Sequence, residues 1–365
     1  MTGIRELGEF GFLRRLRQRA AGRASAAGAA HPGGVVVGMG DDTAVLEFPV
    51  PASAGTAGGV LTAGGGFQLL ATSDMMVEGS HFLLSVITPR QLGHKALAVN
   101  LSDLAAMGGK PLGALLSLGL KGDETTGFLD EFYEGLWQVG ERYGCPLVGG
   151  DTISSPRAMI VDVAALGIVS AGRAVLRSGA RPGDLVLVTG HLGASAAGLY
   201  LGLHPGVAAA DADRAVVIRA HLEPLPRLEE SQAIAAAGPA HAMMDISDGL
   251  ANEVNHICEV SGVGARLWAD RIPIGDATRR VAAAGGADPL EWALYGGEDY
   301  ELVFTVDPRA AEAVARSVED ATGTPVAVIG EVLPASQGIW LEQTGPGGAA
   351  EKAPLEARAW DHFSS

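Results

Sequence analysis

Five short acidic segments interrupt otherwise apolar or glycine-rich sequence, and they restrict the fold of this chain more than any other feature. They are Gly40-Asp41-Asp42, Ser73-Asp74, Ser102-Asp103, Gly149-Gly150-Asp151 and Asp245-Ile246-Ser247-Asp248-Gly249. Isolated carboxylates are poor core residues, because an ionised group is costly to bury without a partner. They are good ligands for Mg²⁺, which selects oxygen donors and commonly keeps substrate phosphates among its ligands. The pattern predicts a fold that gathers these segments around several metal ions, and it favours phosphoryl-transfer chemistry.

Size and charge narrow the classes of partner. With 365 residues, 47% of them hydrophobic, the chain can bury a large core and is long enough for two domains. The net charge of −16 argues against nucleic acid or an anionic membrane surface as a partner, since both attract basic patches. An acidic chain that binds phosphates is expected to do so through metal ions.

Cysteine usage favours a cytoplasmic location for this protein, and the hydropathy pattern predicts no membrane-spanning helix. Cys145 and Cys258 stand apart without zinc-binding spacing, which suits isolated core thiols in a reducing compartment. No run of about 18 uncharged apolar residues is present. An arginine-rich N-terminal stretch could be a transit segment, but two glutamates precede it, and an amphipathic helix with Phe10, Leu13 and Leu16 inward is favoured.

Strands and helices alternate along most of the chain. Two Ala/Gly-rich stretches, 20–34 and 52–66, are expected to be flexible insertions. We expect strands over residues 35–37, 44–46, 67–72, 112–120, 147–148, 159–169, 185–189, 242–246, 265–268 and 301–306. We expect helices over residues 89–107, 125–143, 194–201, 212–221, 227–237 and 250–260, and one that follows the last strand to residue 321.

This succession predicts an α/β (α+β) fold in two domains. An Arg-, Gly- and Pro-rich break over residues 170–183 places the boundary between a domain of residues 1–170 and one of residues 171–365. In this arrangement several carboxylates lie where strands end, and Asn100 and Asp103 share one face of a helix.

A standard nucleotide-binding loop is excluded. Lysine occurs only at positions 95, 110, 121 and 352, none of them in a GxxxxGK[ST] frame. The glycines at positions 38, 40 and 64–66 do not form a GxGxxG motif between a strand and a helix. If ATP binds, metal ions, arginine and backbone N–H groups must hold its phosphates.

Each motif also has a purely structural interpretation. Gly149-Gly150-Asp151-Thr152 follows a short apolar strand and could be an ordinary turn or a backbone anion site with a cation ligand. In Asp245 to Gly249, alternation places Asp245 and Ser247 on one side of a strand, while Ser247 or Asp248 could simply cap the next helix. The set of motifs is more specific than any one of them.

Three further features also have both a functional and a purely structural interpretation. Gly296-Gly297-Glu298-Asp299-Tyr300-Glu301 is a second Gly-Gly-acid turn, or a plain loop. His81 lies in a polar loop, where it could contact a substrate or be a surface histidine. Arg173 and Arg177 flank the domain boundary and could bind phosphate, although for Arg173 a surface salt bridge is preferred.

Taken in order, these segments resemble the thiamine-monophosphate kinase family, which belongs to the aminoimidazole ribonucleotide synthetase-like superfamily. The resemblance covers almost the whole chain. Its motifs are Gly40 to Asp42, Thr72 to Asp74, Gly79 to Phe82, Lys95 to Met107, Gly149 to Thr152, Gly172 to Ala174, Arg177 to Gly179, Asp245 to Leu250 and Gly296 to Leu302. The two Ala/Gly-rich stretches depart from shorter relatives but lie between motifs.

The resemblance implies a function and a set of site residues. The implied function is ATP-dependent phosphorylation of thiamine monophosphate to thiamine diphosphate. The implied Mg²⁺ ligands are Asp42, Thr72, Asp74, Asp103, Asp151, Asp245 and Asp248. The implied ATP contacts are Ser73, Tyr133, Gly150, Asp151, Arg177 and Ser247, and the implied substrate contacts are His81, Glu298 and Trp360.

The resemblance also implies a homodimer formed through strands of the N-terminal domain. That domain would bind ATP and Mg²⁺, and the C-terminal domain would complete the substrate cleft. The substrate phosphate is already a nucleophile, so a direct transfer predicts no catalytic base and no phosphoenzyme.

Two rival hypotheses remain. Another enzyme of the superfamily is disfavoured because this chain lacks both the reactive N-terminal Cys with its Lys partner and the C-terminal Cys of two such relatives. A silent nucleotide or metal sensor would keep the aspartates but show no turnover, and the presence of His81 and Glu298 disfavours it.

Overall fold

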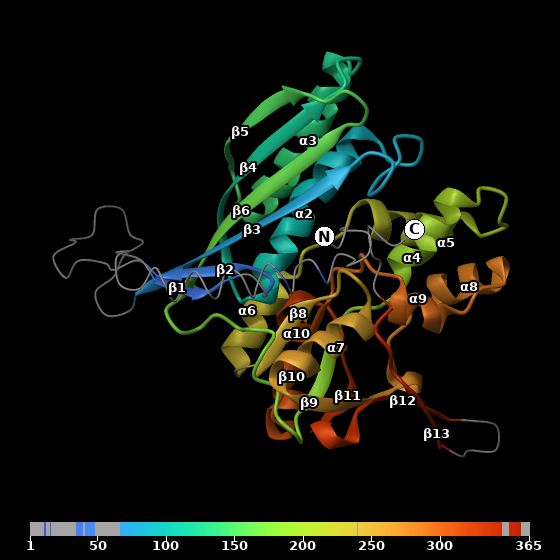
Figure 1. Cartoon of the computed structure of the whole chain (residues 1–365). Helices are drawn as coiled ribbons and strands as arrows, with labels where there is room; N and C mark the ends of the chain where they lie inside the picture. Colours follow the sequence, from blue (N-terminus) through green and yellow to red (C-terminus); the bar gives the residue numbers. More distant parts are fainter. Residues whose placement is uncertain are drawn as a thin grey trace.

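The chain forms two β-sheets with helices packed against them. The computed structural model describes residues 11, 15, 34–38, 41–47, 66–238, 240–344 and 350–358. The two sheets come from successive parts of the sequence (Figure 1), and this confirms the expected α/β (α+β) class. No helix in this part of the chain is long and apolar enough to cross a membrane.

The first sheet has six strands in the order β1-β2-β3-β6-β4-β5. Neighbouring strands are antiparallel except for the parallel pair β4 and β5. The strands are β1 Gly34–Val37, β2 Ala44–Glu47, β3 Phe67–Val77, β4 Lys110–Leu120, β5 Leu147–Ser154 and β6 Ile160–Ser170. Strict alternation of buried residues along β6 shows that one face of this sheet is covered and the other is not.

Two helices cover that face, α2 Pro89–Ala106 and α3 Thr126–Tyr143. The sequence determines where α2 begins, because Pro89 suits a first helical turn and Thr88 forms a capping box with Gln91. Gly108, with a φ of 74°, follows the helix end in a conformation that glycine adopts at little cost.

The second sheet has seven strands in the order β13-β12-β9-β11-β7-β10-β8. They are β7 Leu185–Thr189, β8 Ala242–Asp245, β9 Val263–Trp268, β10 Leu302–Val306, β11 Val326–Pro334, β12 Ile339–Thr344 and β13 Ala350–Pro354. The helices of this half are α4 Ala194–Leu203, α5 Asp211–Leu222, α6 Leu228–Ala237, α7 Leu250–Ser261, α8 Asp276–Gly285, α9 Pro289–Tyr295 and α10 Pro308–Thr322.

Helix α2 packs against both halves and joins them. It lies on β3 and β6 on one side and contacts β8 and α6 on the other (Figure 1). Leu97 and Leu101 belong to the same buried core as Met243 and Phe304 of the second sheet. Burial of each such side chain contributes about 1.5–3 kcal/mol. Polar groups on α2 are therefore held in a fixed relation to the strand ends of the second half.

Two expectations about strand ends are wrong. Strand β3 continues through Asp74 to Val77, because it pairs with β6 along its whole length. The pairing of β3 with its other neighbour, β2, stops at Ala71, which lies opposite Ala44, and beyond that point the N–H of Asp74 donates to Oδ1 of Asn100. Asp74 therefore lies inside a strand whose edge is completed by a helix side chain.

The Gly149-Gly150-Asp151 segment is likewise part of a strand, β5, and not a turn. A Cβ atom on Gly150 would lie 1.7 Å from the backbone oxygen of Leu116 in β4. The close approach of the two parallel strands requires glycine there, so this glycine serves strand packing.

Other differences concern elements that the sequence patterns did not reveal. Strands β11, β12 and β13 and helices α8 and α9 were not expected. Helix α7 is preceded by Gly249 at its N-cap, with no side-chain cap, so Ser247 and Asp248 do not cap it. Both cysteines are buried free thiols, as expected. The predicted N-terminal helix, most of the two Ala/Gly-rich stretches and Trp360 lie outside the described residues.

Candidate functional site: a cluster of buried carboxylates

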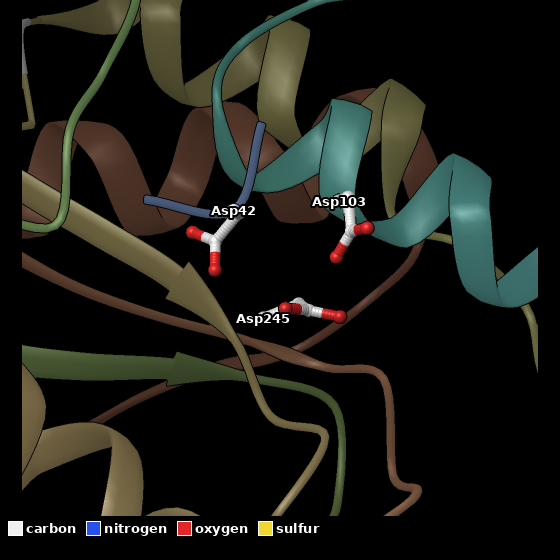
Figure 2. Close-up of side chains that lie close together, drawn as sticks. All are labelled: Asp42, Asp103 and Asp245. Atoms are coloured by element: carbon white, nitrogen blue, oxygen red, sulfur yellow. The ribbon is translucent and has the colours of Figure 1, made fainter. Parts of the chain in front are cut away.

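Three carboxylates from distant parts of the sequence converge between the two sheets. Each of Asp42, Asp103 and Asp245 offers an oxygen atom, and these oxygens all lie within 4.8 Å of one another. Figure 2 shows the three side chains directed into a common space from separate segments of the chain. Such a group of oxygen donors is suited to a hard divalent cation.

Local structure explains the convergence. Asp42 precedes Ala44, the first residue of β2, and Asp245 is the last residue of β8. Asp103 lies in the last turns of α2, the helix shared by both halves. Neighbouring hydroxyls orient two of the carboxylates: Thr72 Oγ1 donates to Asp103 Oδ2 at 2.5 Å, and Ser102 Oγ donates to Asp245 Oδ2 at 2.6 Å.

The cluster carries more negative charge than its surroundings neutralise. Burial raises the pKa of Asp42 to about 7, and nearby Asp41 and Glu253 add to the effect against the opposing Arg177. Burial and the neighbouring carboxylates raise the pKa values of Asp103 and Asp245 as well. Carboxyl groups in this state gain most from a bound cation, which favours the ionised form.

A buried atom without a partner supports a metal site. Asp42 Oδ2 is buried and has no hydrogen-bond partner. An unpaired buried carboxylate oxygen costs free energy unless a cation or another donor satisfies it. The charge, the oxygen donors and this atom all fit Mg²⁺.

Thr72 and Asp74 border the same cluster. Both project from β3 toward the helix-covered side, because their partners across the ladder, Ala165 and Val163, are buried beneath the helices. Burial, together with Asp162, raises the pKa of Asp74 to about 6, and the charge of Asp74 acts on Asp103. Asn100 and Asp103 share the face of α2 that meets β3, as the sequence indicated.

Ser73 and Asp151 lie on the opposite, uncovered face of the first sheet. Asp151, Ser117 and Asp162 are partners across β5, β4 and β6, so their side chains lie in one row on the exposed side. Ser73 Oγ donates to Asp162 Oδ1 at 2.8 Å on that face. Within one chain, therefore, the expected ligand Asp151 and the expected ATP contact Ser73 are not brought together with the three carboxylates.

Tyr133 and Gly150 are also outside the cluster. Gly150 is held between strands of the first sheet. The ring of Tyr133, on α3, packs against Trp137 with centroids 5.6 Å apart.

Arg177 approaches the cluster from the segment that joins the two halves. Its Nη2 atom lies 2.6 Å from Asp42 Oδ1, and its backbone N–H donates to Asp41 at 3.2 Å. The guanidinium is mostly buried, with 13% of the side chain exposed. Its charge partly offsets the acidic group, because it favours the ionised form of Asp42.

Ser247 and Asp248 follow Asp245 and are organised by a residue that the sequence analysis did not select. Glu253 Oε1, from the first turn of α7, accepts from the backbone N–H of Asp248 at 2.9 Å and lies 3.5 Å from Ser247 Oγ. Glu253 is 1% exposed. No motif signalled it.

Glu298 is held by two residues that the sequence analysis also missed. Lys95 Nζ lies 2.8 Å from Glu298 Oε1, and His221 Nδ1 lies 3.2 Å from Glu298 Oε2. Burial alone would raise the pKa of Glu298, but the charge of Lys95 and the His221 hydrogen bond outweigh it and lower that pKa to about 2. A lone lysine in an apolar helix, as at position 95, was the available signal.

His81 lies in the loop after β3. Its Nδ1 atom accepts from the backbone N–H of Val77 at 3.1 Å, and the side chain is half-buried. This contact helps to fix the orientation of the ring. Trp360, the third expected substrate contact, lies outside the described residues.

Comparison with known proteins identifies the fold and its class. Residues 40–169 match the model of the AIR synthase related protein N-terminal domain, and residues 181–340 match that of its C-terminal domain. The chain therefore belongs to the AIR synthase related family.

Its similarity within that family is to thiamine-monophosphate kinases. It is 38% identical over 333 residues to the thiamine-monophosphate kinase of Escherichia coli O157:H7, which covers 91% of this chain and 93% of that one. It is 35% identical over 336 residues to that of Bacillus subtilis, with coverage of 91% and 95%. The solved structure of AaThiL complexed with AMPPCP and TMP matches with a TM-score of 0.78 and 31% identity, covering 100% of this chain and 99% of that one.

Proposed function

We propose that this chain transfers a phosphoryl group from ATP to thiamine monophosphate, giving thiamine diphosphate and ADP in thiamine diphosphate biosynthesis. The observation that carries the proposal is the convergence of Asp42, Asp103 and Asp245, with a buried carboxylate oxygen left without a partner. Close similarity to thiamine-monophosphate kinases along nearly the whole chain supports the particular substrate.

Phosphoryl transfer to thiamine monophosphate requires alignment of the two substrates and neutralisation of their charges rather than proton transfer. The phosphate of thiamine monophosphate is itself the nucleophile, so no side chain has to remove a proton from it. Mg²⁺, when bound, would polarise the phosphoryl oxygens and offset the repulsion between the two anionic substrates. Thr72 and Ser102 keep the carboxylates of Asp103 and Asp245 in fixed orientations, and Arg177 offers a guanidinium to a phosphate beside Asp42.

The assignment of individual residues is part of the proposal. The proposed Mg²⁺ ligands are Asp42, Thr72, Asp74, Asp103, Asp151, Asp245 and Asp248. The proposed ATP contacts are Ser73, Tyr133, Gly150, Asp151, Arg177 and Ser247, and the proposed substrate contacts are His81, Glu298 and Trp360. Residues 1–170 would form the domain that binds ATP and Mg²⁺, and residues 171–365 the domain that completes the cleft. The two free buried thiols suit a cytoplasmic enzyme.

The uncovered face of the first sheet suits a homodimer. Met75, Leu115 and Ile153 are 56%, 41% and 62% exposed on it, and together they give this face a group of exposed large apolar side chains. Ser73 and Asp151 share that face. A second copy of the chain docked there would cover the apolar residues and give both polar residues a neighbouring surface, which accounts for their distance from the cluster in one chain.

Leu115→Glu tests this interface. We expect the wild-type protein to have the mass of a dimer in light scattering and Leu115→Glu to have the mass of a monomer, because a buried charge would face the partner without a counter-ion. Leu203→Glu is the matched control, since Leu203 is 50% exposed at the end of α4, away from the sheet. A Leu115→Glu protein that stays dimeric would argue against this face.

The activity itself is tested by turnover. We expect purified protein with ATP, thiamine monophosphate and Mg²⁺ to form thiamine diphosphate, identified chromatographically, and to form none after removal of metal with a chelator. ATP binding without diphosphate formation would instead favour a sensor or another phosphoryl acceptor. Recovery of a phosphorylated chain during turnover would contradict direct transfer.

A further inference from the structure

Lys95 is a buried cation whose role the carboxylate cluster does not explain. Its side chain is 2% exposed, and its ammonium lies 2.8 Å from Glu298 Oε1. Lysine is almost never fully buried unless it is paired, because its charge loses hydration. The pair joins helix α2 to the loop before β10, so it connects the two halves of the chain.

Glu298 is constrained on several sides yet still accessible. Its φ of 57° is in the left-handed region, a conformation that costs a non-glycine residue about 1–3 kcal/mol. His221 Nδ1 lies 3.2 Å from Oε2 and also 3.0 Å from Ser195 Oγ. The Glu298 side chain nevertheless remains 32% exposed, whereas its partners Lys95 and His221 are 2% and 8% exposed. The two partners are themselves buried, and part of the Glu298 side chain stays exposed beside them.

Helix α2 carries residues that contact both the Glu298 carboxylate and the carboxylate cluster. Lys95 and Ser102 are seven residues apart and therefore share one face of the helix. Ser102 donates to Asp245, and Asp103 is itself a member of the cluster. Asp103 follows Lys95 by eight residues, which corresponds to a distance of about 12 Å along the helix axis at 1.5 Å per residue. One rigid helix thus sets the spacing between an isolated carboxylate and the group of carboxylates suited to metal and phosphate.

We propose that Lys95 is a positioning residue for Glu298. It holds the Glu298 carboxylate ionised, in one orientation and at a fixed distance from the carboxylate cluster. In this position Glu298 binds the cationic organic end of the phosphoryl acceptor. The inference rests on the proposed function, in which the acceptor is thiamine monophosphate, a molecule with a cationic ring system at one end and a phosphate at the other. Lys95 acts through Glu298 and does not contact the acceptor. His221 supports the second carboxylate oxygen in the same way.

Lys95→Met tests the role, because methionine fills the buried space without the charge. We expect the KM for thiamine monophosphate to rise about thirtyfold, the size typical of a lost contact to a charged group. The KM for ATP and kcat at saturating acceptor should stay within about twofold of wild type. A role in folding alone would leave both KM values unchanged and lower only the amount of active enzyme.

Two more variants complete the test. Glu298→Gln should raise the acceptor KM by at least as much, and the double variant Lys95→Met/Glu298→Gln should be no worse than Glu298→Gln, because Lys95 acts only through Glu298. His221→Leu should raise the acceptor KM about threefold and keeps the test decisive if Lys95→Met fails to fold.

The outcomes separate this inference from the proposed function. If the wild-type enzyme forms no thiamine diphosphate, the proposed function is wrong. An active wild type with an unchanged acceptor KM in the folded Lys95 and His221 variants would overturn only the positioning role. Fully additive losses in the double variant would also overturn it, since Lys95 would then act on something other than Glu298.

Discussion

Asp245→Asn is expected to lower kcat/KM for phosphoryl transfer by about a thousandfold while making the metal-free protein more stable. The loss is of the size found when one preorganised charge-stabilising group is removed from an active site. Asparagine preserves the shape of the side chain and can still accept the hydrogen bond from Ser102. It removes one of the converging negative charges, and steady-state kinetics at saturating Mg²⁺ would measure the result.

The stability effect has a definite dependence on pH. Burial raises the pKa of Asp245 in the folded protein, so the folded state retains this proton better than the unfolded state does. Its contribution to stability is therefore present below the unfolded pKa of about 3.9 and declines as pH rises. The thermal midpoint of metal-free Asp245→Asn should exceed that of wild type by roughly 2 °C at pH 8 and by less at pH 5.

Asp320→Asn is the matched control for this variant. Asp320 is exposed on α10, and its replacement removes the same charge far from the cluster. It should leave both kcat/KM and the thermal midpoint unchanged. Mg²⁺ should also raise the midpoint of wild type more than that of Asp245→Asn, because binding to the folded state stabilises it. Near-normal activity of Asp245→Asn would remove Asp245 from the proposed ligands.

Gly93→Ala is expected to destabilise the protein by about 3 kcal/mol, the upper part of the usual range for overpacking. Helices α2 and α3 cross at glycines: a Cβ atom on Gly93 would lie 1.8 Å from the backbone oxygen of Phe132, and one on Gly135 would lie 1.8 Å from that of Arg90. Backbone cannot move aside as a flexible side chain can. The helices would have to separate, and Asp103 on α2 would move with them, so denaturant midpoint and kinase activity should both fall.

Gly127→Ala on α3 provides the comparison for Gly93→Ala. A Cβ atom there would meet only Thr125 Oγ1, at 4.0 Å. The substitution should be neutral or should stabilise the folded state by up to about 0.5 kcal/mol, since alanine has less backbone entropy to lose than glycine. Equal stability of the Gly93 and Gly127 variants would show that the helix crossing tolerates a methyl group.

Much of the fold could be predicted because its elements carry local signals. Strand β7 and helix α2 have clear apolar patterns, and α2 also has a capping box. Strand β3 was predicted too short, because nothing in the local sequence shows that β6 pairs with it beyond Asp74. The expected strand before the Gly-Gly-Asp segment ended at Val148, because the neighbour that requires glycine in β5, Leu116, is 34 residues away from Gly150 in the sequence.

The sequence by itself determined the chemical character of this protein. Isolated aspartates beside Gly and Ser, together with the absence of a P-loop lysine, indicated that metal ions would hold the phosphates. Both of these signals are properties of residue type and spacing. Tertiary structure alone decided which groups meet. It brought Asp42, Asp103 and Asp245 together, placed Asp151 on the opposite face, and joined Lys95 to Glu298 across 203 positions of sequence. The physical reason is that ion pairing and metal ligation depend on distances between side chains, which only the packing of α2 between the two sheets establishes.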